Sequence, residues 1–135
     1  MTELTGSCLC GAISYAADTD IKMTINCHCT DCQKITGSVL GTQLFVMEEA
    51  LTISGVPKVF EHTADSGSRL TKLFCDKCGA QVFSRNSSRA GVIGIRAGSI
   101  AQKDVIQPTI NIFCDSAVPS TPVDPALKSF PGAPG

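Results

Sequence analysis

The stretch FCDKCG, residues 74–79, decides how this chain folds, because it places two cysteines and a glycine in the pattern C-x-x-C-G. The backbone of such a turn directs both sulfur atoms toward one metal ion, and Gly79 allows the left-handed conformation that closes the turn. Two cysteines buried as small apolar side chains would need neither this spacing nor the glycine. We therefore interpret Cys75 and Cys78 as metal ligands.

A second pair of cysteines lies in SCLCG, residues 7–11. If this stretch is a strand, Cys8 and Cys10 share one of its faces. Together with Cys75 and Cys78, this pair completes a set of four thiolates, which is the usual closed ligand set of a structural zinc ion. The spacing predicts that this zinc ties the N-terminal segment to the middle of the chain.

A third group, CHCTDC at residues 27–32, contains Cys27, Cys29 and Cys32. If the two flanking pairs bind one ion, this group binds another alone, and three ligands leave the fourth position open for chemistry. Three thiolates donate strongly, so the ion should activate water poorly but should accept a soft thiolate and keep it deprotonated. The predicted substrate is a thiol, or an adduct of a thiol with a small aldehyde.

Other interpretations of the third group stay open. Cys114 could close the site as a fourth ligand, although its place after an apolar strand, away from other cysteines, favours a core or peripheral thiol. A closed site would make the protein a binding module for a protein partner, with two structural zinc ions. His28 is expected at the surface or against a ligand, and His62 is expected to be structural or exposed. Cages of four thiolates also accept iron.

Composition and charge limit the classes of function. The 135 residues are 43% hydrophobic and 17% charged, which suits a folded domain of ordinary core size. A net charge of −1 without a basic cluster argues against nucleic acid, and no apolar run is long enough to span a membrane. The first ten residues lack the pattern of a secretory signal, so we expect a cytoplasmic protein whose thiols stay reduced and bind metal.

The chain is predicted to be mostly β, built from short antiparallel strands, because Val, Ile, Thr and Phe recur in short runs between turn residues. No segment keeps apolar residues at helical spacing over three turns, so only helical turns are expected, at Asp31–Ile35 and Glu48–Ala50. The predicted strands are Ala12–Ala16, Lys22–Cys27, Val39–Val46, Leu51–Ile53, Lys58–His62, Leu70–Phe74, Ala80–Phe83, Val92–Ala97 and Thr109–Phe113.

The composition changes at Ala117, after which five of the seven prolines occur. Such a segment cannot form a central strand or a regular helix. We expect one domain over residues 1–135, with a core at about 5–116 and a proline-rich arm at 117–135. The arm is either disordered or laid across the sheet, and four apolar anchors favour the second possibility: Val118, Val123, Leu127 and Phe130.

The clusters, in this order, resemble the glutathione-dependent formaldehyde-activating enzyme (GFA) family, which shares its domain with centromere protein V. The resemblance covers about residues 5–130. The stretches that carry it are GSCLCGAISY (6–15), CHCTDCQKITGS (27–38), FCDKCGAQVFS (74–84) and RAGSI (96–100).

The resemblance implies a zinc-stapled fold called a β-tent, with two Zn²⁺ per chain. It assigns the structural zinc to Cys8, Cys10, Cys75 and Cys78, and the catalytic zinc to Cys27, Cys29 and Cys32, as the spacing also does. The implied activity is that of a carbon–sulfur lyase resembling S-(hydroxymethyl)glutathione synthase. Such an enzyme joins formaldehyde to glutathione or cleaves the adduct.

Residues around the clusters are candidates for binding a substrate. Arg96 could pair with a carboxylate of glutathione. Asp31 and His28 are both near enough in sequence to act as a general acid or base through water, and the sequence does not choose between them. Backbone amides and hydroxyls of three consecutive residues could line the pocket: Thr36, Gly37 and Ser38.

The chain departs from the family near its C-terminal end. Ser120 stands where many members carry a tryptophan, and Asn111 falls where they often have a histidine. The tryptophan would form an apolar wall beside a ligand. Its absence leaves the fold prediction intact but leaves the substrate open, along with the oligomeric state.

Overall fold

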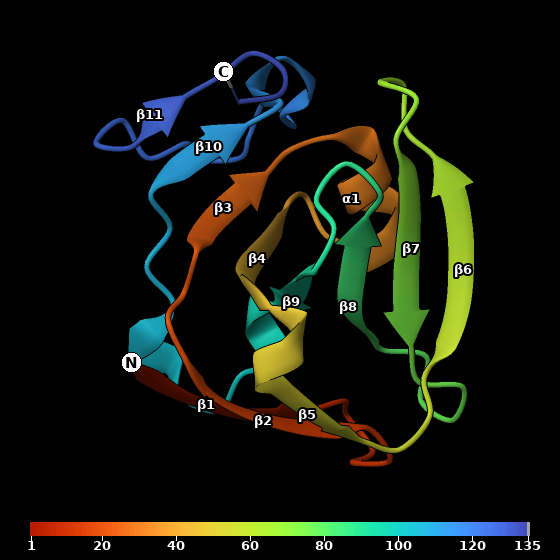
Figure 1. The fold of residues 1–135 in the computed structure, drawn as a ribbon. Coiled ribbons are helices and arrows are strands. Elements are labelled where there is room, and N and C mark those ends of the chain that lie inside the picture. Colours follow the sequence, from red (N-terminus) through yellow and green to blue (C-terminus); the bar gives the residue numbers. More distant parts are fainter. Residues whose placement is uncertain (135) are drawn as a thin grey trace.

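The computed structural model describes residues 1–134. Figure 1 shows a β protein with one α-helix, α1 (Thr30–Thr36), and four short 3-10 helices: η1 (Glu48–Ala50), η2 (Ala97–Ser99), η3 (Lys103–Val105) and η4 (Cys114–Ser116). The strands are β1 (Thr2–Ser7), β2 (Ser14–Thr19), β3 (Met23–Cys27), β4 (Gly41–Met47), β5 (Leu51–Ser54), β6 (Lys58–Thr63), β7 (Arg69–Phe74), β8 (Gln81–Asn86), β9 (Val92–Arg96), β10 (Ile110–Ile112) and β11 (Lys128–Ser129).

The strands form two sheets. The smaller sheet has the order β1-β2-β5 and is antiparallel throughout. The larger sheet has the order β11-β10-β3-β4-β9-β8-β7-β6, and only the pairings of β10 with β3 and with β11 are parallel. In Figure 1 the smaller sheet lies across the lower end of the larger one. A bridge between Gly6 and Ile100 connects the smaller sheet to the segment after β9.

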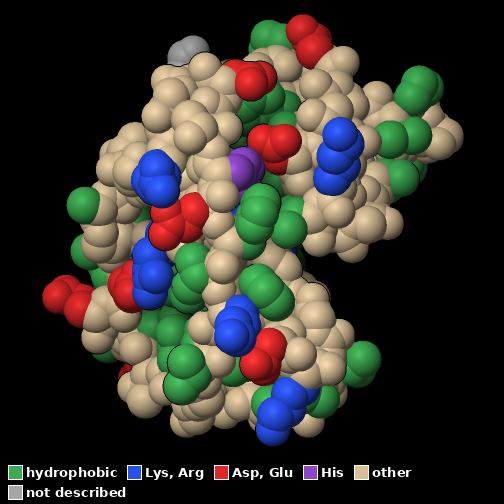
Figure 2. All heavy atoms as spheres, turned by 90° about the vertical axis from the view of Figure 1, so that its right-hand side faces the viewer, with side chains coloured by type: hydrophobic (Ala, Val, Ile, Leu, Met, Phe, Trp, Pro, Cys, Tyr) green, Lys and Arg blue, Asp and Glu red, His purple; other side chains and the backbone are tan. Residues whose placement is uncertain are grey.

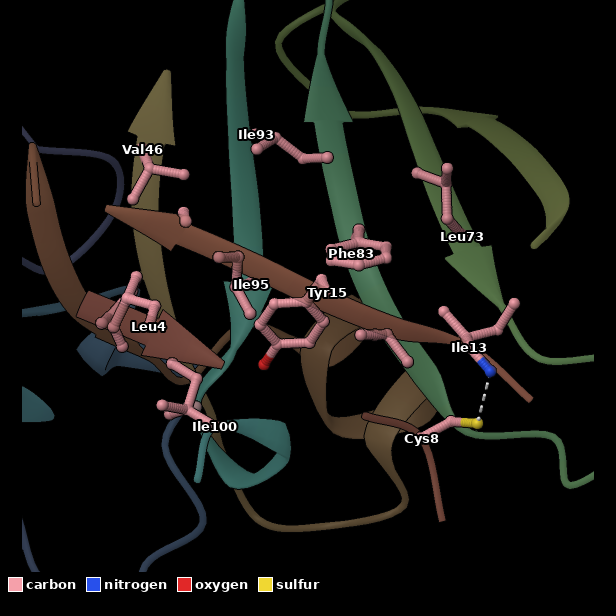
Figure 3. Close-up of a cluster of buried hydrophobic side chains, with 14 of the residues drawn as sticks. Leu4, Cys8, Ile13, Tyr15, Val46, Leu73, Phe83, Ile93, Ile95 and Ile100 are labelled. Carbon is pink, nitrogen blue, oxygen red and sulfur yellow. Dashed lines mark hydrogen bonds between the residues drawn. The ribbon is translucent and has the colours of Figure 1, made fainter. Parts of the chain in front are cut away.

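The main hydrophobic core fills the space between the two sheets (Figure 3). Leu4 and Tyr15 from the smaller sheet meet Leu44, Phe83 and Ile95 from the larger one, and none of these side chains is more than 4% exposed. The Tyr15 and Phe83 rings pack edge to face with their centroids 5.2 Å apart. Burial of each large apolar side chain contributes about 1.5–3 kcal/mol, so this core holds the sheets together.

The predicted fold class is confirmed: the protein is a small, mostly β domain with antiparallel sheets. Every predicted strand has a counterpart, although most bounds differ by one to three residues. The two predicted helical turns correspond to α1 and η1. Two strands were missed, β1 and β11, because neither has the apolar alternation that identifies a strand.

The proline-rich segment is an additional edge of the larger sheet, where β11 pairs in parallel with β10. The Phe130 amide donates to the Asn111 carbonyl at 2.9 Å, and the Phe130 ring packs against a second apolar cluster that contains Cys27 and Ile112. The four predicted anchors are all half-buried. The segment therefore lies along the edge of the sheet and not across its face.

Asn111 fastens this segment to the sheet. Its side chain is 1% exposed, and its amide nitrogen donates to the Asp124 carbonyl at 3.3 Å and to Ser129 Oγ at 3.2 Å. Its oxygen accepts from Asn26 Nδ2 at 3.1 Å. Asn111 thus has a structural role at this edge of the sheet. Among residues 1–134, no helix combines the length and the apolar character needed to cross a bilayer.

Candidate metal centres

Four cysteines from two distant turns form the first cluster. Cys8 and Cys10 follow β1, Cys75 and Cys78 lie between β7 and β8, and all four sulfur atoms lie within 4.8 Å of one another. The Sγ–Sγ distances are 3.8 Å for Cys8–Cys10 and 3.7 Å for Cys10–Cys75. A tetrahedral site with metal–sulfur bonds of about 2.3 Å has edges of about 3.8 Å. The cluster therefore fits a tetrahedral metal ion.

Backbone turns hold these sulfur atoms in place. The Ile13 amide donates to Cys8 Sγ at 3.3 Å, and the Lys77 amide donates to Cys75 Sγ at 3.4 Å, as expected for turns that stabilise thiolates. Gly79 has the predicted left-handed φ of 79° and donates its N–H to the Cys75 carbonyl. The prediction that Cys8 and Cys10 share a strand face is wrong, because β1 ends at Ser7 and they lie in a turn.

Three cysteines form the second cluster, at the junction of β3 and α1. Cys27 ends β3, Cys29 caps the N-terminus of α1 and Cys32 lies in its first turn. Their sulfur atoms lie within 4.8 Å of one another, and the Cys27 thiol donates to Cys29 Sγ at 3.3 Å. The Cys32 amide also donates to Cys29 Sγ at 3.3 Å, so the first turn of α1 gives this sulfur a backbone donor. We call these three residues the cysteine trio.

The electrostatics of the cysteine trio favour a cation at its centre. Hydrogen bonds from Cys27 and Cys29, together with the charge of Arg96, lower the pKa of Cys32 to about 2. Hydrogen bonds to the other two cysteines raise the pKa of Cys27 far above its ordinary value. The three thiols therefore oppose one another's ionisation. A divalent cation would supply the charge that allows three thiolates.

The trio has no fourth protein donor among the described residues. Cys114 is not part of the group. It lies half-buried in η4, where its amide donates to the Phe130 carbonyl at 3.0 Å. This placement agrees with a peripheral thiol and not with a closing ligand. No fourth Cys, His, Asp or Glu therefore joins the trio within residues 1–134, and the open zinc site stays a prediction.

The two histidines differ in burial and in their neighbours. His28 is 1% exposed, so the expectation that it could lie at the surface is wrong, and burial lowers its pKa. His62 on β6 places its Nδ1 atom 4.0 Å from a carboxylate oxygen of Asp31, and the ring of Phe60 stacks on it. Figure 2 shows a histidine at the surface on the β6 side, beside acidic side chains. This contact ties α1 to β6.

Arg96 connects the trio to a cleft. Its guanidinium nitrogens Nη1 and Nη2 lie 3.9 and 4.0 Å from Cys32 Sγ, and its Nε donates to Gln81 Oε1. It crosses over Gly41, where a Cβ atom would come within 2.4 Å of Nη1. The absence of a side chain at Gly41 is therefore what allows Arg96 to reach Cys32.

The cleft has a volume of about 780 Å³, which is within the usual range for small-molecule sites. Its lining includes Thr36, Ser38 and Arg96 of the predicted substrate residues, but not Gly37, which is the left-handed C-cap of α1. The Thr36 hydroxyl donates to the Cys32 carbonyl at 2.7 Å, so it already has a partner within the helix. Lys103 also lines the cleft, so two cations face it.

Sequence reasoning named Arg96 but missed the row of buried polar side chains to which it belongs. Lys72, Ser84, Gln43 and Arg96 are each no more than 7% exposed. Ser84 Oγ donates to Gln43 Oε1 directly over Gly94, where a side chain would collide with both. Only the assembled sheet shows that the face carrying these polar side chains is covered.

Fold and site together define the class: a small two-sheet β protein with one four-cysteine cluster and one three-cysteine cluster, each able to hold a metal ion. The family model for "Glutathione-dependent formaldehyde-activating enzyme" matches residues 3–116, so the chain belongs to this family, as its motifs predicted. No curated protein sequence matches the chain. A crystal structure of a Rhodobacter sphaeroides protein shares the fold, with a TM-score of 0.56, 16% identity, and coverage of 77% of this chain and 96% of that one.

Proposed function

We propose that the protein is a zinc-dependent carbon–sulfur lyase acting on a thiol–aldehyde adduct, with glutathione and formaldehyde as the first candidates. The observation that carries the proposal is the cysteine trio, whose three sulfur atoms lie within 4.8 Å of one another with no fourth Cys, His, Asp or Glu among the described residues. Arg96 links the trio to a cleft of about 780 Å³, which none of the three cysteines lines. Family membership supports glutathione-dependent formaldehyde activation as the general reaction.

Zinc suits both clusters, because sulfur-only ligand sets select Zn²⁺ over magnesium, calcium or manganese. Cys8, Cys10, Cys75 and Cys78 would hold a structural zinc, and the trio would hold a second. At the trio the ion would supply an electrophilic centre that binds a thiol sulfur and keeps it deprotonated at neutral pH.

The residues of the chain itself would bind and orient the substrate. Glutathione carries two carboxylates, and the cleft offers two cations, Arg96 and Lys103. The Ser38 hydroxyl lines the same cleft beside the end of α1, where it can accept or donate a hydrogen bond. We propose Arg96, Thr36 and Ser38 as substrate contacts, and Gly37 as the residue that ends the helix so that Ser38 faces the cleft.

A closed second site with Cys114 as ligand would favour the alternative of a non-catalytic binding module, and Cys114 is not part of the trio's group. The cellular setting that we propose is the cytoplasm. All eight cysteines are free of disulfide bonds, as metal-binding thiols are in a reducing compartment.

The decisive experiment measures metal content and adduct exchange together. Purified protein should contain about two zinc ions per chain, and it should accelerate exchange between free glutathione and S-hydroxymethylglutathione in two-dimensional exchange NMR. Cys29→Ser should lose one zinc and the acceleration, whereas Cys114→Ser should keep both. A protein that holds two zinc ions but leaves the exchange rate at its uncatalysed value would refute the proposed reaction.

A further inference from the structure

Two neighbours hold the guanidinium of Arg96 in one orientation. Its Nε atom donates to Gln81 Oε1, and its Nη1 and Nη2 atoms lie 3.9 and 4.0 Å from Cys32 Sγ. The guanidinium is planar and its N–H groups point in fixed directions, so a bond at Nε determines where the two Nη atoms point. Gln81 therefore selects the orientation in which Arg96 faces Cys32.

Gln81 is itself fixed, with its oxygen and not its nitrogen toward Arg96. Gln81 Nε2 donates to the Phe83 carbonyl, two residues further along the chain. A glutamine side chain has its donor and its acceptor on two different atoms, so this bond leaves Oε1 free to accept from the arginine. Gln81 is half-buried and lines the cleft together with Arg96. The hydrogen bond between the two side chains thus lies at the wall of the cleft.

An irregularity in β8 brings Gln81 to this position. The pairing of β7 with β8 shifts by one residue before Phe74, so that Phe74 lies opposite Gln81 where a regular pairing would place Val82. Val82 and Phe83 consequently both belong to the main hydrophobic core, although consecutive residues of a regular strand alternate between faces. A β-bulge of this kind re-aims the side chain that follows it, and here it moves Gln81 to the face of the sheet that carries Arg96.

The backbone of Arg96 is held as well. Ser99 Oγ donates to the Arg96 carbonyl at 2.8 Å, and the Tyr15 hydroxyl lies 2.7 Å from the same Oγ atom. Tyr15 is 4% exposed and belongs to the main core, so this contact is anchored in the interior of the protein. The freedom that remains to Arg96 is in its long side chain, and Gln81 restrains the end of it.

We propose that Gln81 is a positioning residue that keeps the charge of Arg96 at the junction of the cysteine trio and the cleft. This inference rests on the proposed function, which makes Arg96 a substrate contact. An arginine released from Gln81 can turn its guanidinium away from Cys32 and into the open cleft. An anionic substrate then meets a cation that is still present but no longer preorganised, and binds more weakly.

The first measurement follows the hydrogen bond itself, by NMR of the zinc-loaded protein. The Nε–H proton of Arg96 should exchange with solvent about tenfold faster in Gln81→Met than in the wild type, because it loses its acceptor. Gln102→Met is the matched control, since Gln102 is also half-buried and its side chain also makes two hydrogen bonds, both to Thr5. In this control the Arg96 signal should exchange as in the wild type. Gln81→Ala takes the place of Gln81→Met if the latter does not fold.

The second measurement is a titration of glutathione into cobalt-substituted protein, where a new sulfur ligand changes the visible spectrum. Gln81→Met should weaken glutathione binding about tenfold, the order expected when a hydrogen bond to a charged group is lost. Because Gln81 also lines the cleft, the same substitution is made in Arg96→Met protein. There it should change the affinity by less than about twofold, since a residue that acts through Arg96 has no effect once Arg96 is gone.

Three results would overturn the proposal. Equal exchange of the Arg96 Nε–H proton in wild type and Gln81→Met would show that Gln81 does not hold the guanidinium. Equal glutathione affinity in these two proteins would show that the orientation of Arg96 is not sensed by the ligand. An equal loss of affinity with and without Arg96 would make Gln81 a direct contact. Wild-type protein that binds no glutathione would instead refute the proposed function, and the exchange of the Arg96 signal would still decide whether Gln81 holds the guanidinium.

Discussion

The Gly41→Ala substitution tests the contact between Arg96 and Cys32. The new Cβ would lie 2.4 Å from Arg96 Nη1 and 3.6 Å from Cys32 Cβ. Ordinary van der Waals contact begins at 3.4 Å, so the guanidinium, the flexible end of its side chain, must move by about 1 Å. The fold should survive, because the backbone of β4 has no need to shift.

The magnitude follows from the distance to the sulfur. At an effective dielectric constant of about 20, a unit charge at the 3.9 Å separation of Nη1 and Sγ interacts by about 4.3 kcal/mol, and at about 4.9 Å by about 3.4 kcal/mol. A negative charge at Cys32 Sγ therefore loses about 0.9 kcal/mol of stabilisation, and a thiolate bound at the same separation from Arg96 would bind about fourfold more weakly.

The assay is the titration of glutathione into cobalt-substituted protein, with Gly98→Ala as the matched control. Gly98 lines the same cleft, and a Cβ there would meet no atom within 4 Å. Gly98→Ala should bind the thiol like the wild type. If Gly41→Ala and Gly98→Ala give the same affinity, the reasoning that places the Arg96 charge at the trio is wrong.

Four further predictions concern metal, core, arm and pH. Cys75→Ser should lose one metal equivalent and melt at lower temperature, whereas Cys114→Ser should keep its metal content in elemental analysis. Phe83 is 0% exposed, so Phe83→Ala should lower the free energy of unfolding by about 3–5 kcal/mol. An unchanged midpoint of urea unfolding would contradict this. Asn111→Ala removes three hydrogen bonds and should lower the free energy of unfolding by about 1–3 kcal/mol. Limited proteolysis should then cleave residues 117–134 faster than in the wild type. Burial raises the pKa of Tyr15 to about 12, so the folded protein keeps the phenol proton up to a higher pH than the unfolded chain does. The free energy of unfolding should therefore fall as the pH rises from about 10 toward 12. Tyr15→Phe should abolish that fall.

Local motifs made much of this protein predictable. Cys75 and Cys78 lie in one tight turn, and the trio spans a short turn into α1, so their geometry depends on neighbours in sequence. The run of short Val-, Ile- and Thr-rich segments likewise predicted most strands. β1 was missed because Leu4 is its only strongly apolar residue, yet Leu4 is fully buried once the smaller sheet closes over the core.

The sequence by itself determined the two cysteine pairs, the cysteine trio and the β character of the chain, because these depend on spacing within a few residues. Only the tertiary structure brings Cys8 and Cys10 together with Cys75 and Cys78. Only the tertiary structure decided which charges surround the trio. Lys72 and Arg96 come from strands that are separated in sequence, and the register of β7, β8, β9 and β4 brings them to one covered face. The reason is physical: a charge affects chemistry through its distance and its burial, and both are set by the packing of the sheet.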